Sequence, residues 1–177
     1  MSNLAYIEHY TVEDWKRWED DWELIYGHPY MMAPSPIYGH QFVVSKIVRV
    51  LDEALDDCPK CNVLAEIDYY ISDDTVVRPD VLAICYQPKE NITKTPEIIF
   101  EVVSKSSKKR DEITKKELYE EQKVPYYCIV YPDKKEAFVY HYQDREFVFD
   151  GKFSNKSYTF EVKECKVEFS FSKIWQN

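Results

Sequence analysis

Glycine is scarce in this sequence: only three of the 177 residues are glycine. Neither a G-x-G-x-x-G run nor a Walker-type run is present, and these are the loops with which many folds bind the phosphates of a nucleotide. The scarcity therefore argues against those nucleotide-binding folds, and we expect no nucleotide cofactor.

Long apolar runs are absent as well. A membrane-spanning helix needs about 18 or more apolar residues in succession, and no stretch reaches that length. Residues 1–15 also lack the basic start and apolar run of a secretory signal. We therefore expect a soluble, cytoplasmic protein with no membrane partner.

Cysteines are few and odd in number, with five in the chain. Cys85 and Cys128 lie in apolar runs typical of buried strands, so free thiols are expected rather than a disulfide framework. The motif Cys58-Pro59-Lys60-Cys61 has half of a zinc-ribbon spacing, but a structural zinc needs four ligands. Because no second Cys-x-x-Cys or His-x-x-x-His follows, a plain turn is favoured over a zinc site.

Apolar and aromatic residues, in contrast, are abundant. They make up 45% and 16% of the chain, which is enough for a substantial core at this length. Since no repeat, linker or low-complexity segment divides the sequence, we expect residues 1–177 to form a single domain.

The net charge is −9, which argues against a nucleic-acid partner because Lys and Arg contacts with phosphates dominate that affinity. The local charge is different between residues 104 and 116. That segment holds six basic and two acidic residues, a local sum of +4. It is either a nucleic-acid contact or a solvated loop, and the sequence leaves both open.

The N-terminal region predicts a helix and a hairpin. Thr11, with an acid three residues later, is typical of a helix start, and this short helix is expected to run to about Trp22. Gly27 and Pro29 then indicate the turn of a hairpin in residues 22–32.

The rest of the chain predicts an α/β fold with a mixed sheet. An amphipathic pattern indicates a long helix over residues 40–57, with His40 at the start of its apolar face. Three β segments, a second helix, a strand and an antiparallel meander follow in this order: residues 63–71, 76–86, 97–103, 110–123, 126–131 and 136 onwards, with turns at 143–145 and 150–151.

Two carboxylates fall on neighbouring β segments. Glu101 interrupts the apolar run Ile-Ile-Phe-Glu-Val-Val, and a buried carboxylate must be paired, hydrogen-bonded or metal-bound. Asp80 on the preceding segment could share one divalent cation with it. A salt bridge explains Glu101 taken alone about as well, and Asp80 alone is more often a turn residue at a strand end.

The second helix carries a lysine on its buried side. At 100° per residue, one stripe of this helix contains Asp111, Lys115, Leu118, Tyr119 and Gln122. A lysine that shares a stripe with leucine and tyrosine is unusual, so Lys115 is the candidate of interest. Asp111 is expected to be a partner of the helix N-terminus or of Lys115, and not a metal ligand.

The ordered set of motifs resembles a known family. Its elements are Glu23-Leu24-Ile25-x-Gly27, His40, Arg78-Pro79-Asp80-Val81, Glu101-Val102-Val103-Ser104, Asp111-x-x-x-Lys115-x-x-x-Tyr119 and Val124-Pro125-x-Tyr127. Together, over residues 11–175, they strongly resemble the Uma2 group (DUF820) of the PD-(D/E)XK nuclease superfamily. The lysine of a Glu-x-Lys motif is replaced by Val103, which implies a lysine that has migrated to the second helix. Lys123 and Cys128 also stand where the family usually has glycine and tryptophan.

The resemblance implies a restriction endonuclease-like core, α-β-β-β-α-β, with an N-terminal helix and hairpin and a C-terminal antiparallel meander. It implies an endonuclease that hydrolyses phosphodiester bonds of nucleic acid, with DNA favoured. Asp80, Glu101 and the backbone carbonyl of Val102 would hold Mg²⁺ or Mn²⁺, and Lys115 would be the third catalytic residue.

Four further residues are accessory candidates by the same resemblance. Glu23 could bind the metal through water, and His40 could contact the scissile phosphate. Tyr119 and Gln122 could order Lys115. Ordinary packing is the alternative for Glu23 and His40.

A homodimer is also expected, because a duplex presents two strands related by a dyad. The aromatic residues Phe147, Phe149 and Phe153 could form the dimer surface or could face the core.

Two rival hypotheses remain at this point. One is a catalytically inactive nuclease-fold module that binds nucleic acid or protein, which the acidic total and the missing Glu-x-Lys lysine favour. The other is a structural role in which Asp80, Glu101 and Lys115 form a buried ionic network.

Overall fold

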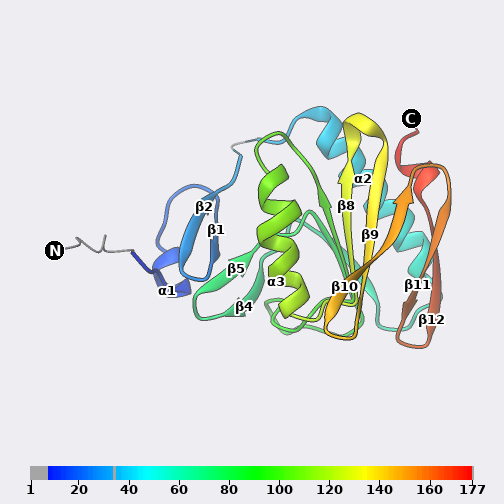
Figure 1. The fold of residues 1–177 in the computed structure, drawn as a ribbon. Helices are drawn as coiled ribbons and strands as arrows, with labels where there is room; N and C mark the ends of the chain where they lie inside the picture. The colour runs from blue at the N-terminus through cyan, green and yellow to red at the C-terminus, as the bar shows by residue number, and fades with distance from the viewer. Residues whose placement is uncertain (1–7, 34, 177) are drawn as a thin grey trace.

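The computed structural model describes residues 8–33 and 35–176. Figure 1 shows helices on both sides of a central sheet. The sheet has six strands, in the order β10 (Glu146–Phe153), β9 (Glu136–Gln143), β8 (Tyr126–Tyr131), β7 (Ile98–Val102), β6 (Val81–Ile84) and β3 (Asn62–Ala65). β7 and β8 run parallel, and the other neighbours run antiparallel. The predicted α/β class with a mixed sheet is confirmed.

One face of this sheet packs against the long helix α2 (Tyr38–Leu55). Alternate residues of β7, among them Phe100 and Val102, share one core with Val43, Ile47 and Leu51 of α2. The three- and four-residue spacing of these helix positions is the reason that they line a single face. The helix begins and ends two residues earlier than the sequence predicts.

The opposite face packs against α3 (Lys115–Glu121), which continues from a π-helical turn, η1 (Arg110–Thr114). Leu118 and Tyr119 of this helix share a second core with Ile99 of β7 and Tyr127 of β8. Because side chains alternate along a strand, Glu101 belongs to the same face as Ile99. The predicted order of core elements, helix, three strands, helix, strand, is confirmed as α2-β3-β6-β7-α3-β8.

A second, four-stranded sheet lies beside this core, in the order β2 (His28–Met31), β1 (Trp22–Ile25), β5 (Thr75–Val77) and β4 (Tyr69–Ser72). The predicted hairpin is confirmed as β1 and β2. The single segments predicted for residues 63–71 and 76–86 are wrong, because each contains two strands that belong to different sheets. A left-handed residue, Glu66 (φ +50°), follows β3, and Pro79, which has no N–H to donate, lies between β5 and β6.

The N-terminal helix α1 (Val12–Trp15) is shorter than predicted. Thr11 caps it as expected, in a capping box with Asp14. The chain then turns through Asp20 in the left-handed conformation (φ +65°) and enters β1, which ends the helix well before Trp22. The indole N–H of Trp15 donates to the Trp22 carbonyl at 2.7 Å and holds the helix against β1.

The C-terminal region extends the central sheet and adds a hairpin. β9 and β10 form the predicted antiparallel pair, but the turn predicted at residues 150–151 is wrong, since β10 passes through it with a bulge between Phe149 and Gly151. β11 (Ser157–Val162) and β12 (Cys165–Ser170) form a separate two-stranded sheet. Two short 3₁₀ turns, η2 (Pro132–Lys134) and η3 (Phe171–Ile174), follow β8 and β12.

The expectation of free thiols is wrong for four of the five cysteines. Cys58 is joined to Cys165 and Cys61 to Cys85 as disulfides, whereas Cys128 is free and buried. The sequence could not show this because the partners are 107 and 24 residues apart and meet only through the tertiary fold. None of the described helices has the length and apolar character to cross a membrane.

Candidate active site

Asp80 and Glu101 face each other across two neighbouring strands. β6 and β7 are antiparallel with Val81 opposite Phe100, so the next positions outward are Asp80 and Glu101. Directly opposed residues of an antiparallel pair point to the same face with Cβ atoms about 4.5–5.5 Å apart. The backbone N–H of Val102 also donates to Oδ2 of Asp80 at 2.6 Å. The structure thus brings together the two carboxylates that the sequence singles out.

Lys115 lies inside this site at the first position of α3 and is only 3% exposed. Its Nζ is 2.9 Å from Oε1 of Glu101 and 2.7 Å from Oε1 of Glu23. The hydroxyl of Tyr119, one turn further along α3, donates to the same Oε1 of Glu101 at 2.7 Å. Neither Lys115 nor Tyr119 uses Oε2 of Glu101.

Glu23 joins the site from β1 and is 1% exposed. Besides the contact with Lys115, it accepts from the backbone N–H of Arg78 at 2.9 Å and from the Arg110 guanidinium at 3.1 Å. It is therefore a direct ion-pair partner of Lys115. Sequence reasoning did not identify Arg78 and Arg110 as partners of this site, although Arg78 belongs to the Arg-Pro-Asp motif and Arg110 to the basic segment.

His40 reaches the site from the first turn of α2, on the other side of the sheet. Its Nε2 is 3.4 Å from Oδ1 of Asp80, and its Nδ1 is buried without a hydrogen-bond partner. Burial opposes protonation, but Asp80, Glu66 and the backbone of Val102 raise the pKa of His40 above its ordinary value.

Asp111, in the π-helical turn before α3, is 1% exposed, and its Oδ2 has no hydrogen-bond partner. Burial raises the pKa of Asp111 to about 6, against the opposing effects of Lys115 and a hydrogen bond with Ser107. A single π turn inside a helix is often associated with a functional site. Sequence reasoning places Asp111 on the same stripe as Lys115 and treats it as a helix-start or lysine partner, but it does not show that one oxygen of this carboxylate lacks a hydrogen-bond partner.

Gln122 does not join this constellation. It caps the C-terminal end of α3, where its backbone carbonyl accepts from the hydroxyl of Thr95 at 3.2 Å. It lies seven positions beyond Lys115 in the sequence. Tyr119 is therefore the member of the predicted pair that the structure places near Lys115.

The buried site contains more carboxylates than cationic groups. Glu23, Glu101 and Asp111 are buried carboxylates, and the cationic groups beside them are the buried Lys115 and the partly buried Arg110. Burial raises the pKa of Glu101 well above its ordinary value, with Lys115 opposing the rise. Burial also acts to lower the pKa of Lys115, but Glu101, Glu23 and Asp111 outweigh it and hold the amine protonated.

The donor set of this site fits a hard divalent cation. Carboxylate oxygens are among the ligands that Mg²⁺ prefers, and the carboxylates of Asp80 and Glu101 come from opposed positions at the ends of adjacent strands and act on one another electrostatically. The excess of buried carboxylates and the unpartnered Oδ2 of Asp111 are consistent with a missing positive charge. Within the described residues, no three His, Cys, Asp or Glu side chains are already gathered around a metal position, so the fit rests on these two carboxylates.

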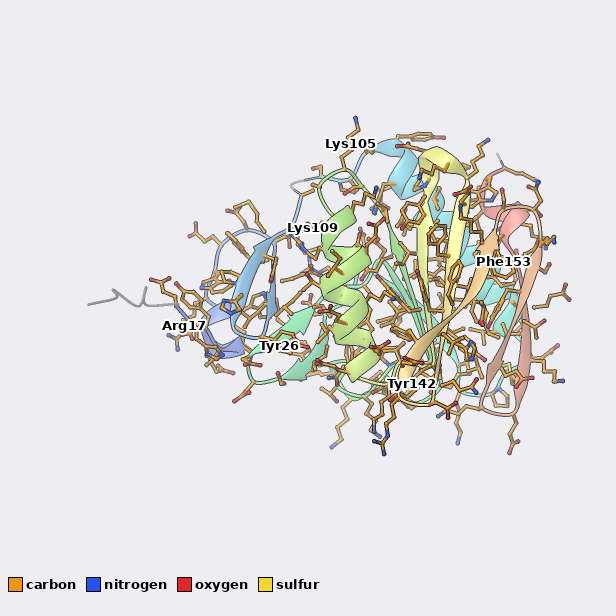
Figure 2. All side chains as sticks on the ribbon, viewed as in Figure 1. Arg17, Tyr26, Lys105, Lys109, Tyr142 and Phe153 are labelled. Atoms are coloured by element: carbon orange, nitrogen blue, oxygen red, sulfur yellow. A yellow bond between two sulfur atoms is a disulfide. The ribbon has the colours of Figure 1, made fainter. Side chains whose placement is uncertain are left out.

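An exposed basic segment begins directly after the strand that carries Glu101. Lys105 is exposed in the turn after β7, and Lys108 and Lys109 are exposed in the helical turn before η1. Figure 2 shows Lys105 at the upper edge of the molecule and Lys109 beside the upper end of the helix that contains α3. The basic segment thus borders the end of the sheet where the carboxylates lie.

Most of the sequence matches a known family. A family model described as "Putative restriction endonuclease", Uma2, matches residues 10–156. The chain belongs to the Uma2 family. The match includes every candidate site residue from Glu23 to Gln122. No curated protein matches the sequence.

The fold of this Uma2 member is similar to that of a solved structure. A protein from Anabaena variabilis ATCC 29413, titled "a putative nuclease belonging to DUF820", superposes with a TM-score of 0.75. The similarity covers 93% of this chain and 97% of that one at 15% sequence identity. At this identity the likeness shows the fold, and the predicted restriction endonuclease-like architecture is confirmed.

Proposed function

We propose that this Uma2 protein is a metal-dependent endonuclease that hydrolyses phosphodiester bonds of nucleic acid, with DNA as the favoured substrate. The observation that carries the proposal is the pair Asp80, directly before β6, and Glu101, at the opposed position of β7, with Lys115 buried beside Glu101. Membership of a family described as "Putative restriction endonuclease" supports the same reaction class.

Asp80, Glu101 and the backbone carbonyl of Val102 would hold one or two Mg²⁺ or Mn²⁺ ions. Such an ion, when bound, supplies a water of lowered pKa and a positive charge for the departing oxygen. The remaining chemistry falls to the side chains of the chain itself.

Lys115 would offset negative charge on the phosphate and orient the attacking water, because its protonated amine lies at Oε1 of Glu101. Tyr119 donates to the same oxygen and so fixes the carboxylate. Glu23 of β1 forms an ion pair with the lysine, and Arg110 of the π-helical turn forms a second ion pair with Glu23. His40, whose protonated form is stabilised by Asp80, would contact the scissile phosphate.

The exposed lysines at residues 105, 108 and 109 would contact the phosphate backbone of the substrate. We infer further that the enzyme acts as a homodimer on duplex DNA. Phe149 is 50% exposed, whereas Phe147 is buried and Phe153 packs against the core, so only Phe149 of the three is available for such an interface.

A buried ionic network is the second candidate role. The contacts of Lys115 with Glu101 and Glu23 favour it, since they satisfy the lysine without any metal. The two roles differ in activity: an ionic network alone gives no cleavage.

The test is incubation of the protein with supercoiled plasmid, linear duplex DNA, single-stranded DNA and RNA, in Mg²⁺, in Mn²⁺ and in a chelator. Asp80→Asn is the matched variant, because its amide oxygen can still accept from the Val102 N–H. The proposal predicts nicking of plasmid by the wild type with metal and loss of nicking in the variant. Equal cleavage by both proteins, or none by either with any substrate, would contradict it.

A further inference from the structure

Four cysteines from distant parts of the chain meet at one place, on the α2 side of the central sheet. Cys58 follows α2, Cys61 precedes β3, Cys85 follows β6 and Cys165 begins β12. Cys58 is buried in the core formed with α2, and the other three are partly buried against that same core. The active-site proposal makes no use of these residues.

The first two cysteines are held by a tight turn. The backbone N–H of Cys61 donates to the carbonyl of Cys58 at 3.3 Å, and Lys60 between them has a left-handed conformation (φ +65°). Such a Cys-Pro-Lys-Cys turn keeps both thiols near one another, at the spacing that zinc sites use. In the sequence alone, this turn offers only two of the four ligands that a structural zinc needs.

The fold supplies the two missing ligands. β3 and β6 are antiparallel with Asn62 opposite Ile84, so Cys85 is opposite Cys61, and their Cα atoms are 3.9 Å apart. The β11–β12 hairpin packs on α2 and brings Cys165 to Cys58, with a Cα–Cα distance of 6.0 Å. Cys58 therefore has Cys165 as its neighbour, and Cys61 has Cys85.

We propose that, when reduced, these four residues bind one structural Zn²⁺ as Cys58, Cys61, Cys85 and Cys165 thiolates. Zinc takes four cysteine ligands tetrahedrally with Zn–S distances of about 2.3 Å, which places the four sulfurs about 4 Å from one another. In the structure the four sulfurs are paired as two disulfides, and the described residues contain no group of three His, Cys, Asp or Glu side chains that could hold a metal. Because the thiolate is the form of cysteine that binds a metal, the metal form requires reduction first.

The conversion balances as two disulfide reductions followed by metal binding. Each disulfide takes two electrons and two protons from a dithiol reductant, which itself becomes a disulfide. The four resulting thiols then release four protons as they coordinate Zn²⁺.

The position of the cluster gives the metal a structural task. β3 is the edge strand of the central sheet, and β11 and β12 form a two-stranded sheet of their own. A two-stranded hairpin is only marginally stable by itself. A zinc ion bound by all four cysteines would tie this hairpin to the end of α2 and to the sheet edge.

The experiment is metal analysis of the whole chain, purified with a phosphine reductant and zinc in the growth medium. We expect about one zinc per chain by elemental analysis, and release of that zinc when a mercurial modifies the thiols. Cys165→Ser and Cys85→Ser should each lose most of the zinc. Cys128→Ala, which changes the free cysteine buried in β8, should retain it, as should Asp80→Asn.

Cobalt provides a readout on the wild type that needs no variant. Co²⁺ added to the reduced, metal-free chain should give thiolate-to-cobalt absorption and the visible bands of a tetrahedral site. Absence of these bands would overturn the proposal. So would a reduced chain that contains no zinc, or zinc that is lost with Asp80→Asn and kept in the cysteine variants. Mass spectrometry of the chain after treatment with the reductant provides one more check. A mass four hydrogens below that of the fully reduced chain would mean that both disulfides persist, and this result would also overturn the proposal.

Discussion

Lys115 is the residue on which the electrostatics of the candidate active site depend. It is buried between Glu101 and Glu23, and no other lysine is among the buried residues that the structure describes. Removing one partner of a buried ionic group leaves the other charges uncompensated, which costs about 3–5 kcal/mol. Both proposed roles of Lys115 depend on this arrangement.

Lys115→Met should lower the free energy of unfolding by about 3–5 kcal/mol and abolish cleavage. Lys116→Met is the matched control, because Lys116 is the next residue and its amine lies over the ring of Tyr140, 4.7 Å from the ring centre. Removing that cation–π interaction should cost less than about 1 kcal/mol. Urea denaturation of the three proteins measures both values, and equal destabilisation of the two variants would disprove the special position of Lys115.

Asp111 should make stability depend on pH. Its pKa is raised by burial to about 6 in the folded chain, above the value of about 3.9 for an unfolded aspartate. The folded state therefore binds the proton more tightly. The stability from this group is fully present below about pH 4 and is lost as the pH rises through about 6.

Asp111→Asn should remove this dependence. The free energy of unfolding of the variant minus that of wild type should rise by on the order of 1–3 kcal/mol from pH 4.5 to pH 7.5. Denaturation at both pH values without metal measures this difference. Glu112→Gln, at the neighbouring and less buried position, is the control. A difference between wild type and Asp111→Asn that is constant with pH would contradict the assignment.

At this scale the sequence predicts some site residues and not others. Glu101 and Lys115 are visible because a charged residue in an apolar run or stripe stands out against its neighbours, and Asp80 is visible because it lies on the β segment before Glu101. The contacts of Arg78 and Arg110 with Glu23 are not visible, because they depend on where β1 meets the rest of the fold. The cysteine pairs could not be predicted either, because their partners meet only through the tertiary fold.

The elements of the core follow the sequence pattern, and the departures have local causes. Periodicity places α2 to within two residues and β8 at its observed ends. The β segments 63–71 and 76–86 look continuous in sequence, yet each crosses from one sheet to another at Glu66 or Pro79. Hydrophobic alternation does not reveal such a crossing, because residues on both sheets are apolar.

The exposed basic segment between β7 and α3 should contribute to the affinity for nucleic acid. The triple variant Lys105→Ala, Lys108→Ala, Lys109→Ala should bind duplex DNA more weakly than wild type in a catalytically inactive Asp80→Asn background. The slope of log affinity against log salt should fall by up to about 0.9 for each phosphate that the variant no longer neutralises. Fluorescence anisotropy at several salt concentrations measures both quantities.

The control for this segment is a triple variant in the C-terminal region, Lys156→Ala, Lys166→Ala, Lys173→Ala. These lysines are exposed just before β11, in β12 and in η3, and the net charge changes by the same amount. If both triple variants weaken binding equally, the loop does not contact DNA specifically and is a solvated segment.

At the scale of the whole molecule, the ordered motifs identify the family and the fold, and the total charge identifies neither. A net charge of −9 argues against a nucleic-acid partner, but part of that charge is the group of buried carboxylates at the candidate site. The motifs place the chain in the Uma2 family and fix the architecture, as the family match and the solved relative bear out. The substrate and the metal dependence follow from the side chains of the site and not from the fold.

The central claim is that Asp80 and Glu101 bind a divalent cation, and metal-dependent thermal stability tests it most directly. Melting temperatures would be measured in Mg²⁺ and Mn²⁺ titrations for wild type, Asp80→Asn and Asp133→Asn, the last an exposed acid in η2 that controls for general charge effects. At about 100 times the dissociation constant, wild type and Asp133→Asn should gain on the order of 5–10 °C, and Asp80→Asn should gain little. No metal-induced rise in wild type, or the same rise in Asp80→Asn, would contradict the account and favour the buried ionic network.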